Sequence, residues 1–207
     1  MEAPLVSPPP FEANQHITFG CFGGPYKLNL DCLKLWAGAL NATPRSRLVI
    51  QNTGMNIPSN AEFVRNRLGQ LGIHPDRISI IPGDDREVIL QNYALMDISL
   101  DSWPYCGGNT IAEALWQGVP VVTLRGNRFV SGYGASLLQS AGIGELAAGN
   151  PDEFASTCAI LAGDVEKLRF LRINLRTMMV EHGMSDPVRM ARSLEKAFVE
   201  MSQIASV

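Results

Sequence analysis

A pair of glycines followed by a helix start is the segment of this sequence best suited to hold a ligand. Gly107 and Gly108 precede Asn109 and Thr110. Glycines let the backbone approach a ligand closely, and the N–H groups that open a helix point at whatever binds there. Asn109 and Thr110 could cap the helix and donate to phosphate oxygens. Glu113, one turn on, could accept hydrogen bonds from two ribose hydroxyls. A plain glycine turn with a solvated glutamate fits the spacing equally well.

Lys27 is the second candidate, because it follows the Gly23–Gly24 turn. Its charge could neutralise a diphosphate, although most lysines in loops are only solvated. The spacing is not the GxxxxGK[ST] of a P-loop, and a strict GxGxxG is missing, which disfavours P-loop ATP hydrolysis and a dehydrogenase. A bound diphosphate would therefore rely on backbone dipoles and on lysine or arginine.

The cysteines and histidines do not predict metal or disulfide chemistry. The four cysteines contain no CxxC pair, the three histidines form no HExxH or HxH cluster, and there is no DxD pair. Zinc sites and disulfide scaffolds need such clusters. We expect ordinary thiols and histidines, and no metal.

Short apolar runs alternate with helical patterns, which predicts the framework that positions these residues. Strands are expected at 16–22, 46–52, 78–83, 97–101, 119–124 and 145–148, and helices at 30–40, 60–71, 86–95 and 109–118. This alternation favours an α/β fold, a Rossmann-like doubly wound parallel sheet. Ligands bind such sheets beyond the carboxyl ends of the strands, where both candidate segments fall. Two apolar helical faces after residue 150 predict a helical C-terminal cap.

Composition narrows the possible partners. Residues 1–15 hold four prolines, which predicts an extended, proline-rich linker ahead of one domain at 16–207. The net charge of −3 disfavours a nucleic-acid partner. No apolar run reaches the roughly 20 residues of a membrane span, and the first residues lack a signal pattern. We expect a cytoplasmic protein without a membrane partner.

Four segments carry a family resemblance. HITFGCF with Tyr26 and Lys27, DISLDSWPYCGGNTIAEALWQGVPVVTL, GNRFVSGYGASLL and SDPVRMARSLEKAFVEM together resemble the C-terminal catalytic half of the protein O-GlcNAc transferase (SPINDLY-like) family, over about residues 16–203. The resemblance implies the UDP-sugar-binding half of a two-lobed GT-B glycosyltransferase. The implied reaction is inverting, metal-independent transfer of N-acetylglucosamine from UDP-GlcNAc to a protein serine or threonine, without a cofactor.

The resemblance also assigns roles to single positions. Lys27 matches a lysine that contacts the diphosphate and is needed for catalysis. Gly108, Asn109 and Thr110 fall on the segment that cradles the phosphates, directly after Gly107. Glu113 matches an acidic position that binds the ribose.

The uridine side follows the third strand, where the match is less complete. Arg86 matches a basic residue near the uridine, and Asp84 lies where backbone reads the uracil edge. Ile89 occupies a position that often carries histidine, so it could pack on the base without a polar contact. Gly132 replaces an arginine of the common SRVG sequence.

The resemblance implies partners that this sequence does not contain, namely an N-terminal catalytic half, tetratricopeptide repeats and an acceptor protein. We therefore do not expect catalysis by this chain alone. Two alternatives stay open: a non-catalytic interaction module of the same fold, and a relative that uses another UDP-hexose. Trp103, Tyr105 and Tyr133 could lie near a sugar, although such aromatic residues more often pack.

Overall fold

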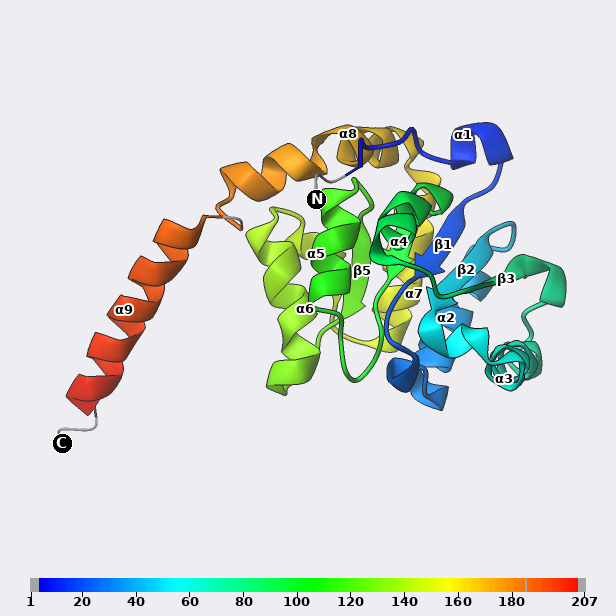
Figure 1. Cartoon of the computed structure of the whole chain (residues 1–207), viewed down its shortest axis with the longest axis horizontal. Helices are drawn as coiled ribbons and strands as arrows, with labels where there is room; N and C mark the ends of the chain where they lie inside the picture. Colours follow the sequence, from blue (N-terminus) through cyan, green and yellow to red (C-terminus); the bar gives the residue numbers. More distant parts are fainter. Residues whose placement is uncertain (1–3, 185, 205–207) are drawn as a thin grey trace.

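The computed structural model describes residues 4–184 and 186–204, and its centre is a six-stranded sheet (Figure 1). The strands are β1 (Thr18–Cys21), β2 (Arg47–Asn52), β3 (Ile78–Pro82), β4 (Ile98–Leu100), β5 (Val121–Leu124) and β6 (Ala147–Ala148). All neighbouring strands are parallel, in the order β3-β2-β1-β4-β5-β6. The chain builds outward from β1 to β3 and then returns to the other side of β1. The doubly wound prediction is confirmed, with the switch point between β1 and β4.

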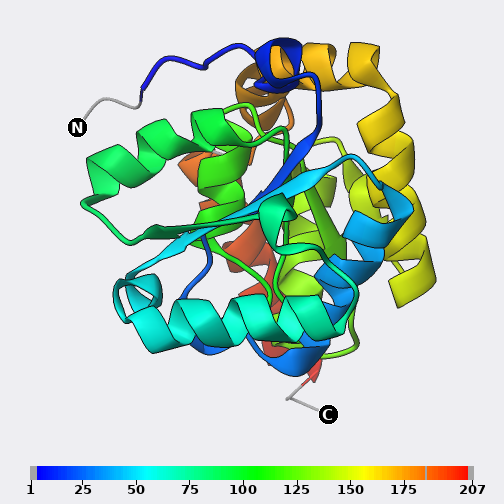
Figure 2. The same cartoon turned by 90° about the vertical axis from the view of Figure 1, so that its right-hand side faces the viewer.

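Helices lie on both sides of the sheet (Figures 1 and 2). They are α2 (Leu30–Ala42), α3 (Pro58–Gln70), α4 (Arg86–Asn92), α5 (Asn109–Trp116), α6 (Phe129–Ser140), α7 (Pro151–Gly163) and α8 (Val165–Glu181). Helix α2 packs against α3 and α7, and α5 packs against α6 and α8. Because helices cover both faces, the central strands are apolar on both faces, which explains their unbroken hydrophobic runs.

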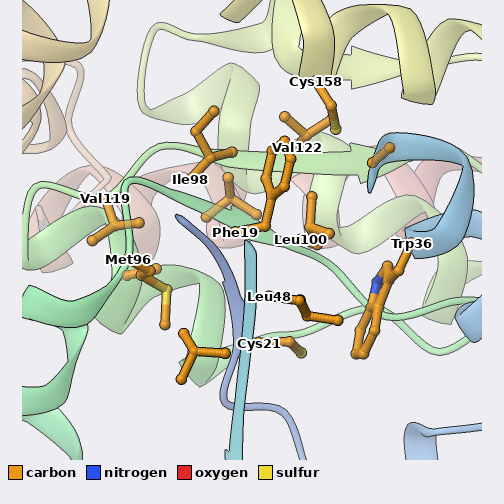
Figure 3. Packing of buried hydrophobic residues seen from close by; sticks show 14 of the residues in the cluster. Phe19, Cys21, Trp36, Leu48, Met96, Ile98, Leu100, Val119, Val122 and Cys158 are labelled. Atoms are coloured by element: carbon orange, nitrogen blue, oxygen red, sulfur yellow. The ribbon is translucent and has the colours of Figure 1, made fainter. Parts of the chain in front are cut away.

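The core lies where the central strands meet these helices (Figure 3). Every residue of β1, β4 and β5 is buried. Phe19, Ile98 and Trp36 are fully enclosed. The indole N–H of Trp36 donates to the backbone oxygen of Asp101 at 2.8 Å, so the largest core side chain also fixes the end of β4.

The N-terminal segment contains a short helix that the prediction of an extended stretch did not include. Helix α1 (Phe11–Asn14) follows Pro10, whose φ of −64° suits a helix start. Phe11 is buried, and its N–H donates to Asp97 at 3.0 Å. Glu12 pairs with Arg169 at 2.7 Å. The prolines predicted a backbone of restricted conformation. They did not predict the contacts of this segment, because its partners, Asp97 and Arg169, lie far along the chain.

The C-terminal helices differ in whether they pack on the domain. Helices α7 and α8 cap the domain as expected, and Leu168, Leu171 and Leu175 are buried. Helix α9 (Pro187–Ile204) instead extends away from the body (Figure 1), and none of its residues is buried. The expectation that its apolar face packs on this domain is wrong, because periodicity identifies a face without identifying what covers it.

No helix among residues 4–184 and 186–204 is long and apolar enough to cross a membrane.

Candidate functional site

The site lies at the carboxyl ends of β1 and β4, next to the switch point. Here the 3-10 helix η1 (Pro25–Lys27) follows β1, and the loop 101–108 follows β4. Between them lies a cavity of about 390 Å³. Its lining combines aromatic side chains, one lysine and the start of α5: Gly24, Tyr26, Lys27, Tyr105, Cys106, Gly108, Asn109, Thr110, Phe129, Val130 and Tyr133. Lys27 and the segment with Gly108, Asn109 and Thr110, which the sequence offers as two separate candidates, therefore share one cavity.

Lys27 is a buried cation without a paired carboxylate. Its side chain ammonium donates to the Cys106 carbonyl oxygen at 2.8 Å and lies 4.2 Å from the centre of the Tyr105 ring. The residue is only 8% exposed, and within the described residues no carboxylate oxygen lies within 4.0 Å of the ammonium. A buried charge is costly unless it is compensated. The cavity is therefore suited to a negatively charged ligand.

The start of α5 offers further donors to such a ligand. Within the described part of the chain, the backbone N–H groups of Gly108, Asn109 and Thr110 donate no hydrogen bond. Gly108 is the N-cap and supplies no side-chain bond, so the expected capping by Asn109 or Thr110 is wrong. These open N–H groups and the helix dipole favour an anion.

Two glycines in this segment act differently. A Cβ on Gly108 would meet the Tyr133 ring at 3.1 Å, so its missing side chain leaves room between α5 and α6. The N–H of Gly107 donates to the Asp101 carboxylate at 2.7 Å, and Gly107 does not line the cavity. The contact of Gly107 is therefore within the loop 101–108, and not with the cavity.

Aromatic side chains form two walls of the cavity. Tyr26 and Tyr105 have ring centres 6.2 Å apart, and Phe129 stacks on Tyr133 at 5.8 Å. All four are at least 41% exposed. Trp103 is not among them and lines a separate hollow between α2 and α7. The walls suit a ligand with an apolar ring face, such as a pyranose.

The predicted uridine side lies beside the start of α4. The Arg86 guanidinium is 2.8 Å from the Glu113 carboxylate, so these two candidates meet. Burial raises the pKa of Glu113, and the Arg86 charge opposes that shift. Ile89 is half-buried on α4. Asp84 is exposed, accepts the N–H of Asp85 at 2.8 Å and has no hydrogen bond to the other candidates.

Sequence reasoning missed Asp101 as a site residue. Its buried carboxylate accepts the N–H groups of Ser102 and Gly107 and the hydroxyl of Thr123. Burial raises its pKa to about 6, and these hydrogen bonds oppose the shift. The available signal was an aspartate directly after the apolar strand 98–100, at the sheet edge where the other candidates gather.

A larger hollow of about 870 Å³ lies at the opposite edge of the sheet, among α1, the end of α2 and the start of α8. It holds none of the candidate residues. It also lies at the amino ends of the strands, where parallel sheets do not place their ligands. The candidate residues Lys27, Gly108, Asn109 and Thr110 therefore gather at the smaller cavity and not at this hollow.

The structure places the cysteines in the interior of the domain. All four cysteines are free and buried, and burial raises the pKa of Cys21 to about 12. Among the residues that the structure describes, no group of three or more His, Cys, Asp or Glu side chains could hold a metal ion.

Comparison with known proteins identifies similar chains. The model of glycosyl transferase family 41 matches residues 12–192. SPINDLY of Solanum lycopersicum, a probable UDP-N-acetylglucosamine–peptide N-acetylglucosaminyltransferase, is 37% identical over 204 residues, which is 97% of this chain and 22% of the relative. SPINDLY of Oryza sativa subsp. japonica is 38% identical with the same coverage. The chain thus spans about a fifth of the length of these relatives.

Solved structures show the same fold. An O-GlcNAc transferase mutant of Thermobaculum terrenum superposes with a TM-score of 0.83 at 34% identity, over 90% of this chain and 36% of that one. Anabaena HepE in complex with UDP superposes with a TM-score of 0.59 at 16% identity, over 90% of this chain and 52% of that one. The second match supports the fold alone.

Proposed function

The chain belongs to glycosyl transferase family 41, and we propose that it forms the UDP-sugar-binding part of an inverting, metal-independent transferase that moves N-acetylglucosamine from UDP-GlcNAc to protein serine or threonine. The family match and the likeness to O-GlcNAc transferases support this proposal. A cytoplasmic location remains a prediction from the sequence.

One observation carries the proposal at the level of the site. The Lys27 ammonium is buried and has no carboxylate partner among residues 4–184 and 186–204, and it lies beside open N–H groups at the start of α5. A diphosphate supplies the missing negative charge and the acceptors for those donors. In this arrangement, Lys27 and the α5 start hold the phosphates.

The same groups would assist the transfer step. The acceptor hydroxyl oxygen forms a bond to the sugar C1 while the bond from C1 to the β-phosphate oxygen breaks, and UDP leaves with the bonding electrons. Negative charge then grows on the β-phosphate. Lys27 and the helix donors stabilise that charge without reorganising, as electrostatic catalysis requires.

The remaining site residues hold the nucleoside and the sugar. Glu113 accepts the ribose hydroxyls, with Arg86 beside it. Ile89 packs on the base, and the backbone at Asp84 reads the uracil edge. The aromatic walls contact the sugar. The acceptor protein and the group that takes the hydroxyl proton belong, in this proposal, to an N-terminal catalytic half, with tetratricopeptide repeats as a further partner.

Calorimetric titration with UDP, UDP-GlcNAc and UDP-glucose, with and without Mg²⁺, tests the proposal. We expect UDP and UDP-GlcNAc to bind with dissociation constants between about 1 μM and 1 mM, typical of substrate sites, and Mg²⁺ to change them little. Tighter binding of UDP-glucose than of UDP-GlcNAc would reassign the sugar. Absence of binding at millimolar concentration would contradict the proposal and favour the interaction module.

A further inference from the structure

Two buried aspartates flank β4, one at each end. Asp97 precedes the strand and accepts the N–H groups of Phe11 and Thr18, at 3.0 and 2.8 Å. It therefore ties the N-terminal segment to the amino edge of the sheet. Asp101 follows the strand at the carboxyl edge, beside the cavity. The two residues are 2% and 5% exposed, so burial alone does not distinguish them.

The carboxylate of Asp101 closes the loop that follows β4. Its Oδ1 accepts the N–H of Ser102 at 2.8 Å and the N–H of Gly107 at 2.7 Å, so one oxygen joins both ends of the loop. Its Oδ2 accepts the hydroxyl of Thr123, on β5, at 2.6 Å. The loop is thus anchored to the neighbouring strand through a single side chain.

This loop carries the anion-binding groups of the site. The carbonyl oxygen of Cys106, in this loop, accepts a hydrogen bond from the Lys27 ammonium. Gly108, at the end of the loop, is the N-cap of α5. Helix α6 supports the same loop, because the Gly134 N–H donates to the Cys106 sulfur at 3.1 Å. A Cβ on Gly134 would come within 2.8 Å of the Asp101 Oδ2, so α6 packs directly against the carboxylate.

We propose that Asp101 is a positioning residue for the donor diphosphate: by joining Ser102, Gly107 and Thr123, its carboxylate holds the loop in the conformation that brings Lys27 and the open N–H groups of α5 together. This inference rests on the proposed function, since it names what orders that site. Asp101 does not line the cavity and acts through the loop.

The hydrogen-bond directions identify a rescuing substitution. Asparagine at position 101 keeps one carbonyl oxygen that can accept from both Ser102 and Gly107, and its amide can donate to the Thr123 oxygen. Alanine removes all three contacts and leaves two buried N–H groups without an acceptor, which is costly. If the loop contacts matter, Asp101→Asn should retain the site and Asp101→Ala should not.

The test combines UDP titration with amide hydrogen exchange measured without ligand. We expect Asp101→Ala to bind UDP at least tenfold more weakly and to exchange the Ser102 and Gly107 amides at least tenfold faster. Asp101→Asn should stay within threefold of wild type in both measurements. Asp97→Ala, the matched control, should lower the unfolding temperature while the folded protein keeps its UDP affinity within threefold.

If Asp101→Ala does not fold, Thr123→Val gives the same test, because valine keeps the shape and removes the hydroxyl bonded to the carboxylate. We expect two- to fivefold weaker UDP binding and faster exchange at Gly107. Unchanged affinity in Asp101→Ala, or equal losses in Asp101→Ala and Asp97→Ala, would overturn the proposal. If wild type binds no UDP, the proposed function fails, while unchanged exchange in Asp101→Ala would separately show that Asp101 does not order the loop.

Discussion

The ammonium nitrogen of Lys27 lies 2.8 Å from the carbonyl oxygen of Cys106, a residue 79 positions further along the sequence. This contact joins the segment after β1 to the loop after β4, the two strands at the switch point of the sheet. The cation and the donors at the start of α5 thereby face one cavity.

Removing the Lys27 charge should weaken nucleotide binding without unfolding the protein. We expect Lys27→Ala to bind UDP about 10- to 100-fold more weakly, since a hydrogen bond to a charged group contributes about 1.5–3 kcal/mol. The free energy of unfolding should change by less than about 1 kcal/mol, because an uncompensated buried charge leaves together with its one hydrogen bond. Calorimetry and urea unfolding measure the two quantities.

Lys34→Ala is the matched control for that substitution. Lys34 lies on α2 and pairs with Asp31 at 3.5 Å, and its side chain is 56% exposed. We expect unchanged UDP affinity, because exposed pairs contribute little and Lys34 does not line the cavity. Equal losses in both variants would mean that net charge, and not the position of Lys27, governs binding.

Arg86 and Glu113 should act on the nucleotide as a coupled pair. Glu113→Ala should weaken UDP binding about tenfold, the loss expected for one charged hydrogen bond. Arg86→Ala should weaken it about threefold, and the double variant about tenfold, because residues in contact are not additive. Calorimetric titration of wild type, the two single variants and the double variant with UDP measures the coupling between the two residues.

If the losses of UDP binding free energy in the two single variants add up in the double variant, Arg86 and Glu113 are not coupled and each makes a separate contact with UDP. Glu87→Ala provides the control, since Glu87 is exposed and lies next to Arg86 on α4. It should bind UDP as wild type does.

The buried carboxylate of Asp101 should make stability depend on pH in one direction. Its pKa is raised from 3.8 to about 6 by burial, so the unfolded chain ionises first as pH increases. The stability contributed by the protonated group is complete below pH 3.8 and is lost as pH rises through about 6. The nearby thiols of Cys21 and Cys106 have raised pKa values and stay neutral in this window.

Asp101→Asn removes this titration. Between pH 4 and pH 8, the unfolding free energy of the variant should therefore rise relative to wild type by about 2 kcal/mol, since each pKa unit corresponds to about 1.4 kcal/mol and the unfolded carboxyl is already partly ionised at pH 4. Urea unfolding at several pH values measures the difference. A pH-independent difference would mean that Asp101 does not titrate in this range.

The two C-terminal helices should differ sharply in their effect on stability. Leu175 on α8 is fully buried, so Leu175→Ala should cost about 2–5 kcal/mol of unfolding free energy. The double variant Leu194→Ala and Phe198→Ala on α9 should change it by less than about 0.5 kcal/mol, because both side chains are exposed. Chemical unfolding measures both, and a large loss in the double variant would show that α9 packs on the domain in solution.

All six strands and most of the helices could be predicted from the sequence, whereas α1 and α6 were missed. The apolar runs that became β1, β4 and β5 predict buried strands, because a strand covered by helices on both faces needs no polar side. Alternation with helices then predicts a parallel sheet, and that topology places ligand groups after the strands. Lys27 and Gly108 could be selected on this basis because each lies shortly after a strand. Glu113 could be selected because it lies one turn into the helix that follows Gly108.

Which of these residues meet, and what holds them, depends on contacts that the sequence pattern does not contain. The pairing of Arg86 with Glu113, the contact between Lys27 and Cys106, and the hydrogen bond from Thr123 to Asp101 all join segments that periodicity treats separately. Packing also placed Phe11 in the core and left α9 exposed, although both segments carry apolar residues. Local spacing reports which face of an element must be covered, whereas the partner that covers it depends on contacts between residues far apart in the chain.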